Sequence, residues 1–233
     1  GTYMYHCHVE ATEHMQMGML GNLYVTPRQD GTAIEYPPAS GKIYTKFAYN
    51  DGDGSTGYDV DYPIQMWSFD SAFHDASFEV QPLPFANMKD DYAMLNARGY
   101  PDTVVEGPLP APMENGYKQS QAVSSKITAQ QGQRVLLRVS NLNVTRFYTL
   151  SSPGIPMQVV GKDAKQLRNS ETGEHLYYMT NSVTLGGGEA MDIILDTTNV
   201  APGTYVLHTT NLNYLSNGTE DFGGMMTEIT ITQ

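Results

Sequence analysis

Residues 1–19 read GTYMYHCHVEATEHMQMGM and hold three of the six histidines of the chain together with its only cysteine. The first eight residues have the composition of a β-strand, in which successive side chains point to opposite faces. Cys7 would then point to one side, and His6 and His8 would both point to the other. One strand could therefore contribute to two metal sites at once.

On the cysteine side, the sequence offers a thiolate at Cys7, an imidazole at His14 and a thioether at Met19. Cysteine and histidine with a weak axial methionine form the ligand set of a blue-copper electron-transfer centre. Met15 and Met17 are alternatives for the axial position or for the core. An isolated cysteine is usually a small buried hydrophobe, but so many potential ligands within nineteen residues favour a metal site.

This motif resembles the last copper motif of the multicopper oxidases, the family of laccases, ascorbate oxidase and bilirubin oxidase. The resemblance implies that Cys7 and His14 bind type 1 copper with Met19 axial. It also implies that His6 and His8 each bind one type 3 copper of a trinuclear cluster that reduces O2 to water. Laccase-type sequences usually have three residues where this chain has five, at 9–13. The longer loop is similar to that of copper nitrite reductases, which lack the second histidine of the triplet, so His8 favours an oxidase.

Composition restricts the possible partners. The chain has 233 residues, enough for one large β domain or two small ones, and its 13 Lys and Arg against 25 Asp and Glu give a net charge of -12. Such a surface repels nucleic acid and anionic lipid. No stretch approaches the ~18 to 20 apolar residues of a membrane helix. The family resemblance implies an extracellular or periplasmic location.

We expect an all-β, cupredoxin-like Greek-key sandwich with antiparallel sheets, preceded by the terminal strands of a copper-binding cupredoxin domain. Residues 1–26 would end that copper domain, 27–41 would form a linker, and 42–233 would form a copper-free cupredoxin-like domain. Short helical turns are expected at Ser71–Phe73 and Lys89–Leu95. The expected strands are Leu20–Val25, Ile43–Tyr49, Ile64–Phe69, Ser124–Ile127, Val135–Val139, Phe147–Leu150, Met157–Val160, Ser182–Leu185, Ala190–Leu195, Gly203–His208 and Thr227–Thr232.

The second domain carries further family signatures and an internal repeat. DYAMLNARGYP at 91–101, MQVVGKD at 157–163 and GEAMD at 188–192 resemble segments of noncatalytic cupredoxin domains. GTYVLHTT at 203–210, followed by GMM at 224–226, repeats residues 1–8 and 18–19. Thr209 and Thr210 replace Cys7 and His8, and only His208 is retained, so we expect no copper in this domain.

Other candidate sites have weaker support. His74 and His175 are isolated and are expected to be structural. DGDGS at 51–55 begins like a calcium loop, but Thr56 and Tyr62 stand where such a loop needs glycine and glutamate, so a turn is expected. The sequons at 143–145 and 217–219 would permit glycosylation in a secreted eukaryotic chain.

Three functions stay open at this stage. The first is an O2-reducing multicopper oxidase, in which substrate electrons enter at His14 and pass through Cys7 to His6 and His8. The second is a nitrite-reductase-like enzyme, and the third is an electron carrier or structural copper protein. A trinuclear cluster uses four His-x-His pairs and this chain has one, and a blue-copper site also needs a second histidine. We therefore expect the chain to be a fragment, inactive alone, completed by upstream cupredoxin domains or by neighbouring subunits of a homo-oligomer. Phenols, Cu(I), Fe(II) and Mn(II) are all possible substrates.

Overall fold

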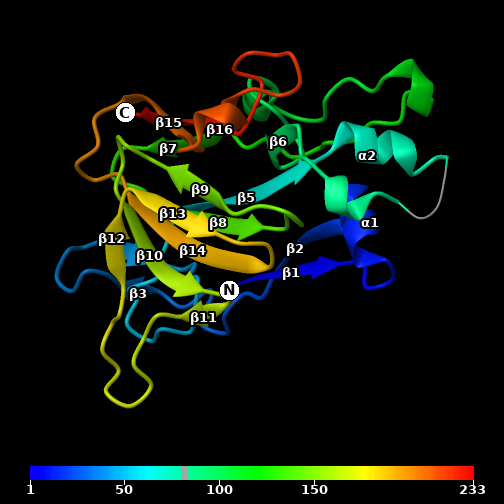
Figure 1. Ribbon diagram of the computed structural model, residues 1–233. Helices are drawn as coiled ribbons and strands as arrows, with labels where there is room; N and C mark the ends of the chain where they lie inside the picture. Colours follow the sequence, from blue (N-terminus) through cyan, green and yellow to red (C-terminus); the bar gives the residue numbers. More distant parts are fainter. Residues whose placement is uncertain (80–82) are drawn as a thin grey trace.

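Two β-sheets packed face to face form the main body of the chain (Figure 1). The computed structural model describes residues 1–79 and 83–233. The first sheet has the strand order β11-β10-β14-β8-β5-β6, with β12 paired to β10, and the second has the order β13-β9-β15-β16-β7. The first sheet comprises β5 (Val60–Phe69), β6 (Tyr92–Leu95), β8 (Arg134–Asn141), β10 (Met157–Lys162), β11 (Lys165–Gln166), β12 (Tyr178–Thr180) and β14 (Glu189–Asp196). The second comprises β7 (Ile127–Gln130), β9 (Tyr148–Ser151), β13 (Ser182–Leu185), β15 (Gly203–Thr209) and β16 (Met226–Thr232).

The strand pairing is mixed, although the all-β prediction is confirmed. Most neighbours are antiparallel, but β5 pairs with β8 and β16 pairs with β7 in parallel. β5 is joined to β8 through β6 and β7, which belong to different sheets, so the chain crosses the sandwich and re-enters the first sheet in its original direction. Parallel neighbours need such a crossover. The expectation of purely antiparallel sheets was therefore wrong.

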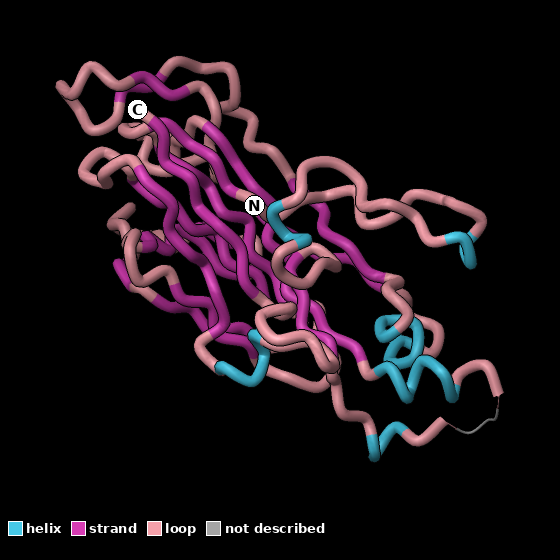
Figure 2. The backbone as a smooth tube through the Cα atoms, turned by 90° about the horizontal axis from the view of Figure 1, so that it is seen from above, coloured by secondary structure: helices cyan, strands magenta, loops and turns pink. Residues whose placement is uncertain are grey.

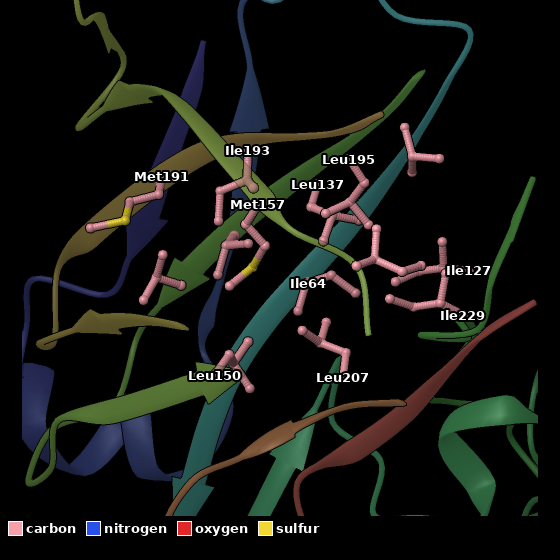
Figure 3. Packing of buried hydrophobic residues seen from close by; sticks show 14 of the residues in the cluster. Ile64, Ile127, Leu137, Leu150, Met157, Met191, Ile193, Leu195, Leu207 and Ile229 are labelled. Carbon is pink, nitrogen blue, oxygen red and sulfur yellow. The ribbon is translucent and has the colours of Figure 1, made fainter. Parts of the chain in front are cut away.

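Alternating side chains of the two sheets form the core between them (Figure 3). Ile193 and Leu195 of β14 point inward, and Leu207 of β15 and Ile229 of β16 meet them from the other sheet. All four side chains are at most 1% exposed. The aligned packing of two such sheets needs no metal to hold it together.

The outer face of the first sheet is also buried, which explains why all eight residues of β8 are inaccessible. Leu136 and Ile194 pack there against Tyr49 and Tyr58 of the segment that precedes β5. A strand buried on both faces loses the apolar-polar alternation of a half-exposed strand. The sequence around Val135–Val139 accordingly reads as a nearly continuous apolar run.

The N-terminal hairpin, β1 (Thr2–His6) and β2 (Leu20–Tyr24), attaches to this outer face through polar side chains. The buried carboxylate of Asp192 on β14 accepts hydrogen bonds from Thr2 Oγ1 at 2.6 Å and from Thr2 N at 3.2 Å. Ser140 Oγ donates to Asn22 Oδ1 at 2.8 Å. These contacts fix the hairpin on the sandwich with one of its faces turned toward β8 and β14.

Short elements complete the chain and correct several expectations. β3 (Ile34–Glu35) pairs with β4 (Ile43–Tyr44), so the predicted linker contains a strand and the predicted strand at 43–49 is much shorter. α2 (Ser71–Ala76) confirms the helical turn at Ser71–Phe73, and Asp70 accepts from Phe73 N as its N-cap. The 3-10 helices are η1 (Phe85–Asn87), η2 (Asp102–Val104), η3 (Met113–Asn115) and η4 (Leu212–Leu215).

One local prediction was wrong, and one short helix was not predicted. The helical turn expected at Lys89–Leu95 is instead β6, whose Tyr92–Leu95 residues pair antiparallel with β5 and bury three successive side chains. The loop between the two hairpin strands contains the helix α1 (Ala11–Gln16), which was not predicted. Alanine, glutamate, methionine and glutamine favour helix, but six residues are too few to show a clear helical period in the sequence.

The internal repeat is confirmed by the strand register. His6 pairs with Leu20 in the first hairpin, and His208 pairs with Met226 in the hairpin β15–β16. The backbone N–H of Cys7 donates to Met19 O at 3.1 Å. In the second hairpin, the backbone N–H of Thr209, which is equivalent to Cys7, donates to Met225 O at 3.0 Å.

The two copies differ in what covers their apolar face. Leu207 and Ile229 of the second hairpin are 1% and 0% exposed, whereas the equivalent Tyr5 and Leu23 of the first are 59% and 54% exposed. The same hairpin face is thus a sandwich core in one copy and surface in the other.

Both sequon asparagines are buried in the folded chain. Asn143 is 3% exposed and Asn217 is 5% exposed. The Asn217 amide nitrogen donates to Ala93 O at 3.1 Å and to Gly223 O at 2.7 Å. A glycan on either amide would break this packing. None of the described helices is long and apolar enough to cross a membrane.

Substitutions at Leu23 and Ile229, which occupy equivalent positions in the two hairpins, test the difference in burial between them. In chain 1–233, Ile229→Ala should lower the free energy of unfolding by about 2–5 kcal/mol, because it leaves a cavity in the core. Leu23→Ala should cost less than about 1 kcal/mol, because the side chain is already half exposed. Urea denaturation of both variants gives the two values. Equal losses would show that the first hairpin is as well covered as the second.

Candidate metal centre

Cys7 and His14 face each other across the loop that joins β1 to β2. Cys7 Sγ lies 3.0 Å from His14 Nδ1, and it also contacts Val9 O at 3.0 Å. Cys7 is partly buried. A thiolate sulfur and an imidazole nitrogen aimed at one point are the soft donors that a copper ion prefers. The structure thus brings together two of the three residues predicted for type 1 copper.

Helix α1 sets the position of His14. The helix starts after Glu10, which adopts a left-handed conformation with φ of 53°. The N–H of His14 donates to Glu10 O at 3.0 Å, and the outer ring atom His14 Nε2 lies 3.7 Å from the Glu10 carboxylate. Nδ1 therefore faces the cysteine while Nε2 is turned toward the surface.

His6 and His8 lie together on the other side of Cys7. Their rings stack with centroids 4.7 Å apart and planes at 23°. β1 ends at His6, and the stacked rings show that the side chains of His6 and His8 still point to the same side. His6 Nδ1 lies 2.8 Å from Cys7 O, and because a carbonyl only accepts, this nitrogen carries the proton. In the neutral ring, Nε2 then keeps a free lone pair, and metal-bound histidines commonly show the same second hydrogen bond.

Met19 is placed by its backbone. Its N–H donates to His14 O at 2.9 Å, and its carbonyl accepts from Cys7 N at 3.1 Å. The side chain is 51% exposed. Met19 therefore connects Cys7 and His14 through the main chain.

The five predicted ligands do not form a closed site by themselves. Within residues 1–79 and 83–233, no three His, Cys, Asp or Glu side chains gather closely enough to hold a metal ion. A hollow of about 740 Å³ includes none of the five candidate ligands and is lined by residues such as Lys42 and Tyr205. A smaller hollow of about 210 Å³ lies beside α1, between Glu10, Glu13 and Phe85.

The other histidines have structural contacts. His208 repeats the contact of His6, with Nδ1 2.8 Å from Thr209 O. His175 Nε2 lies 2.9 Å from Asp53 Oδ2. His74 Nε2 donates to Gln16 O at 2.6 Å, a contact with the loop between β1 and β2 that the sequence did not reveal.

The calcium-like segment forms a turn. The carboxylate of Asp51 accepts from Gly54 N at 2.9 Å and from Thr56 N at 2.6 Å. The Asp51 oxygens are thus used within the turn, as expected for an Asx turn.

Asp90 is a second functional candidate that sequence analysis missed. Burial is the largest influence on its pKa and would raise it, but four side-chain hydrogen bonds together outweigh burial and hold the pKa below its usual value. The donors are Ser68 Oγ at 2.6 Å, Thr145 Oγ1 at 2.6 Å, Asn143 Nδ2 at 2.9 Å and Gln16 Nε2 at 3.1 Å. Asp90 thus connects the sandwich to the loop that carries the ligands.

Comparisons with known proteins agree with this fold. The family model described as multicopper oxidase matches residues 73–231. The blue copper oxidase of Nitrosomonas europaea superposes with a TM-score of 0.66 at 21% identity, covering 99% of this chain and 56% of that one. The multicopper oxidase mgLAC gives 0.66 at 22% identity, with coverage of 99% and 56%. A search of curated protein sequences gives no match.

A copper nitrite reductase from Nitrosomonas europaea is also similar, with a TM-score of 0.61 at 16% identity, covering 100% of this chain and 62% of that one. The fold is therefore the cupredoxin-like sandwich of copper enzymes. The chain belongs to the multicopper oxidase family. It spans little more than half the length of these solved relatives.

The lowered pKa of Asp90 predicts a specific pH dependence of stability. A carboxylate with a folded pKa below its unfolded value of about 3.9 stabilises the fold above that pH, and the contribution is lost as pH falls through the folded pKa. Asp90→Asn should therefore unfold more easily than the wild type at pH 7, by about 1–3 kcal/mol. The difference in the free energy of unfolding between the variant and the wild type should disappear in acid. Urea denaturation between pH 7 and acid pH measures this difference. A difference that does not change with pH would contradict a lowered pKa of Asp90.

Proposed function

We propose that this chain is part of an O2-reducing multicopper oxidase. In this proposal, Cys7 and His14 hold type 1 copper with Met19 axial, while His6 and His8 each hold a copper of a trinuclear cluster. The observation that supports it most is the division of sides at residues 6–8. Cys7 Sγ faces His14 Nδ1 at 3.0 Å on one side, and the stacked rings of His6 and His8 lie on the other.

Bound copper would supply one-electron redox chemistry at both sites. The chain contributes the connection between them, because Cys7 is bonded through the main chain directly to His6 and His8. The main-chain hydrogen bond from Cys7 N to Met19 O keeps this connection rigid. The outer edge of His14, next to Glu10 and the hollow beside α1, is the proposed point where a small reducing substrate delivers its electrons.

The exposed face of the first hairpin supports a shared site. Tyr5 and Leu23 occupy the positions that Leu207 and Ile229 occupy in the second hairpin, where a facing sheet buries them. A two-stranded hairpin is marginal alone. We infer that strands of an upstream cupredoxin domain, or of a neighbouring subunit in a homo-oligomer, cover this face, which is the Cys7 side, and supply the second histidine of the type 1 site. The other cluster ligands would come from such a domain or subunit on the side of His6 and His8.

A nitrite-reductase-like enzyme is the second candidate. The structural similarity to a copper nitrite reductase and the expanded loop 9–13 favour it. His8 favours the oxidase, because a second imidazole beside His6 suits a type 3 pair. An electron carrier would need only the type 1 site and no type 3 pair. The family supports an extracellular or periplasmic location. The net charge of -12 disfavours binding to nucleic acid.

Replacement of the cysteine tests the type 1 site. In the intact protein loaded with copper, Cys7→Ser should abolish the intense thiolate-to-copper absorption at about 600 nm and all substrate oxidation. Thr209→Ser, at the equivalent position of the second hairpin, is the matched control and should leave the absorption unchanged. An intact wild-type protein without this band would refute the site.

Replacement of the methionine tests the axial ligand. Met19→Leu should raise the reduction potential while copper stays bound, because the axial bond is long and weak and mainly tunes the site. Met17→Leu should leave the potential unchanged. Redox titration of the absorption band measures both variants, and a shift with Met17→Leu instead of Met19→Leu would identify the other methionine as axial.

A further inference from the structure

The helix that carries His14 is held by the second domain at its C-terminal end. The indole N–H of Trp67, on β5, donates to Met15 O at 3.1 Å. His74 Nε2, on α2, donates to Gln16 O at 2.6 Å. Figure 1 shows α1 and α2 at the same end of the molecule, and Figure 2 shows some of the helical segments close together beyond one end of the strands.

The side chain of Gln16 adds the most specific of these contacts. It is 0% exposed, although it lies on a short helix at the surface of the chain. Gln16 Oε1 accepts from Asp70 N at 2.9 Å, and Gln16 Nε2 donates to Asp90 Oδ1 at 3.1 Å. Both ends of the amide thus have partners in the second domain.

The binding partners of Gln16 are organised by other residues. The Asp70 carboxylate accepts from Phe73 N at 3.0 Å as the N-cap of α2, and it also accepts from Lys89 N at 2.6 Å. Asp90 receives three further donors from the sandwich, as described above. Asp70 and Asp90 are therefore held in place by contacts of the second domain that do not involve Gln16.

Helix α1 cannot keep its own order. It has six residues, far below the ~12 to 15 at which isolated helices become even marginally stable in water. Its position must come from tertiary contacts, and Gln16 is its one buried residue. Gln16 lies two residues after His14 and three before Met19, so a shift of its side chain would displace both candidate ligands.

We propose that Gln16 is a positioning residue for the copper ligands, which locks α1 to the copper-free domain through Asp90 and the N–H of Asp70. It thereby sets the geometry of His14 relative to Cys7. The copper-free domain then has a direct effect on the type 1 site. The statement about copper rests on the proposed function, whereas the locking of α1 does not.

The test compares Gln16→Met with Gln29→Met in the full-length protein. Methionine keeps the length of the side chain and removes the hydrogen bonds. Gln29 is a matched control, because its Nε2 donates to Asp51 Oδ1 at 2.7 Å and its Oε1 accepts from Gly52 N at 2.9 Å, outside the ligand loop. Hydrogen exchange of the metal-free protein reports on the amides of residues 17–19, which all donate within the loop.

Gln16→Met should speed exchange of these three amides by about tenfold or more, as expected for the loss of one or two buried hydrogen bonds. Exchange in β8 and β14 should stay unchanged, and Gln29→Met should leave the loop unchanged. In the copper-loaded protein, only Gln16→Met should shift the reduction potential and the electron paramagnetic resonance spectrum of type 1 copper.

Unchanged loop exchange in Gln16→Met would overturn the proposal. Faster exchange throughout the second domain would also overturn it, because Gln16 would then support the whole fold rather than the ligand loop. Faster loop exchange with an unaltered copper spectrum and potential would refute the effect on copper. A wild type that shows no thiolate-copper band would refute the proposed function, while the exchange result would still decide whether Gln16 locks α1.

Discussion

The candidate site depends on the alternation of side chains at the end of one β-strand. Because neighbours on an extended chain point to opposite sides, Cys7 meets His14 while His6 and His8 stack together on the other side. A donor set of one thiolate and one imidazole is thus joined by a few covalent bonds to a pair of imidazoles. Everything else in the N-terminal region serves to hold this strand end in place: the β1–β2 register, the link from Cys7 N to Met19 O, and the short helix that returns His14 to the cysteine.

The same hairpin occurs twice in the chain with different roles. In the second domain, Thr209 replaces the cysteine and is fully buried, and Met225 is buried at the position of the exposed Met19. That copy contributes part of the sandwich core. The first copy keeps its polar face against the second domain, through Thr2 and Asp192, and leaves its apolar face at the surface. The two copies suggest how a duplicated fold divides its tasks: one retains ligand chemistry, and the other provides a rigid support.

Much of the site could be predicted from sequence, because ligand types and their spacing along the chain are local properties. Cys7 and His14 do meet, and the strand predicted at Gly203–His208 forms and repeats the register of the first hairpin. Long-range features could not be predicted. The Lys89–Leu95 segment resembles a helical turn by composition, but pairing with β5 makes Tyr92–Leu95 a strand. Likewise, α1 is too short to show a period, and the contact of Gln16 with Asp90 joins residues 74 positions apart. Tertiary packing decided these features, and local propensity did not.

The central claim is that one strand end serves two copper sites at once. Copper content together with the absorption and electron paramagnetic resonance spectra of the intact protein tests it most directly. The account predicts about four coppers per complete site, by the sum of one type 1 ion and a three-ion cluster. Cys7, the only cysteine of this chain, would provide the thiolate-to-copper band. A protein with type 1 copper and one further copper would indicate a nitrite-reductase-like site. A protein that binds no copper, or binds it without the thiolate band, would contradict the account.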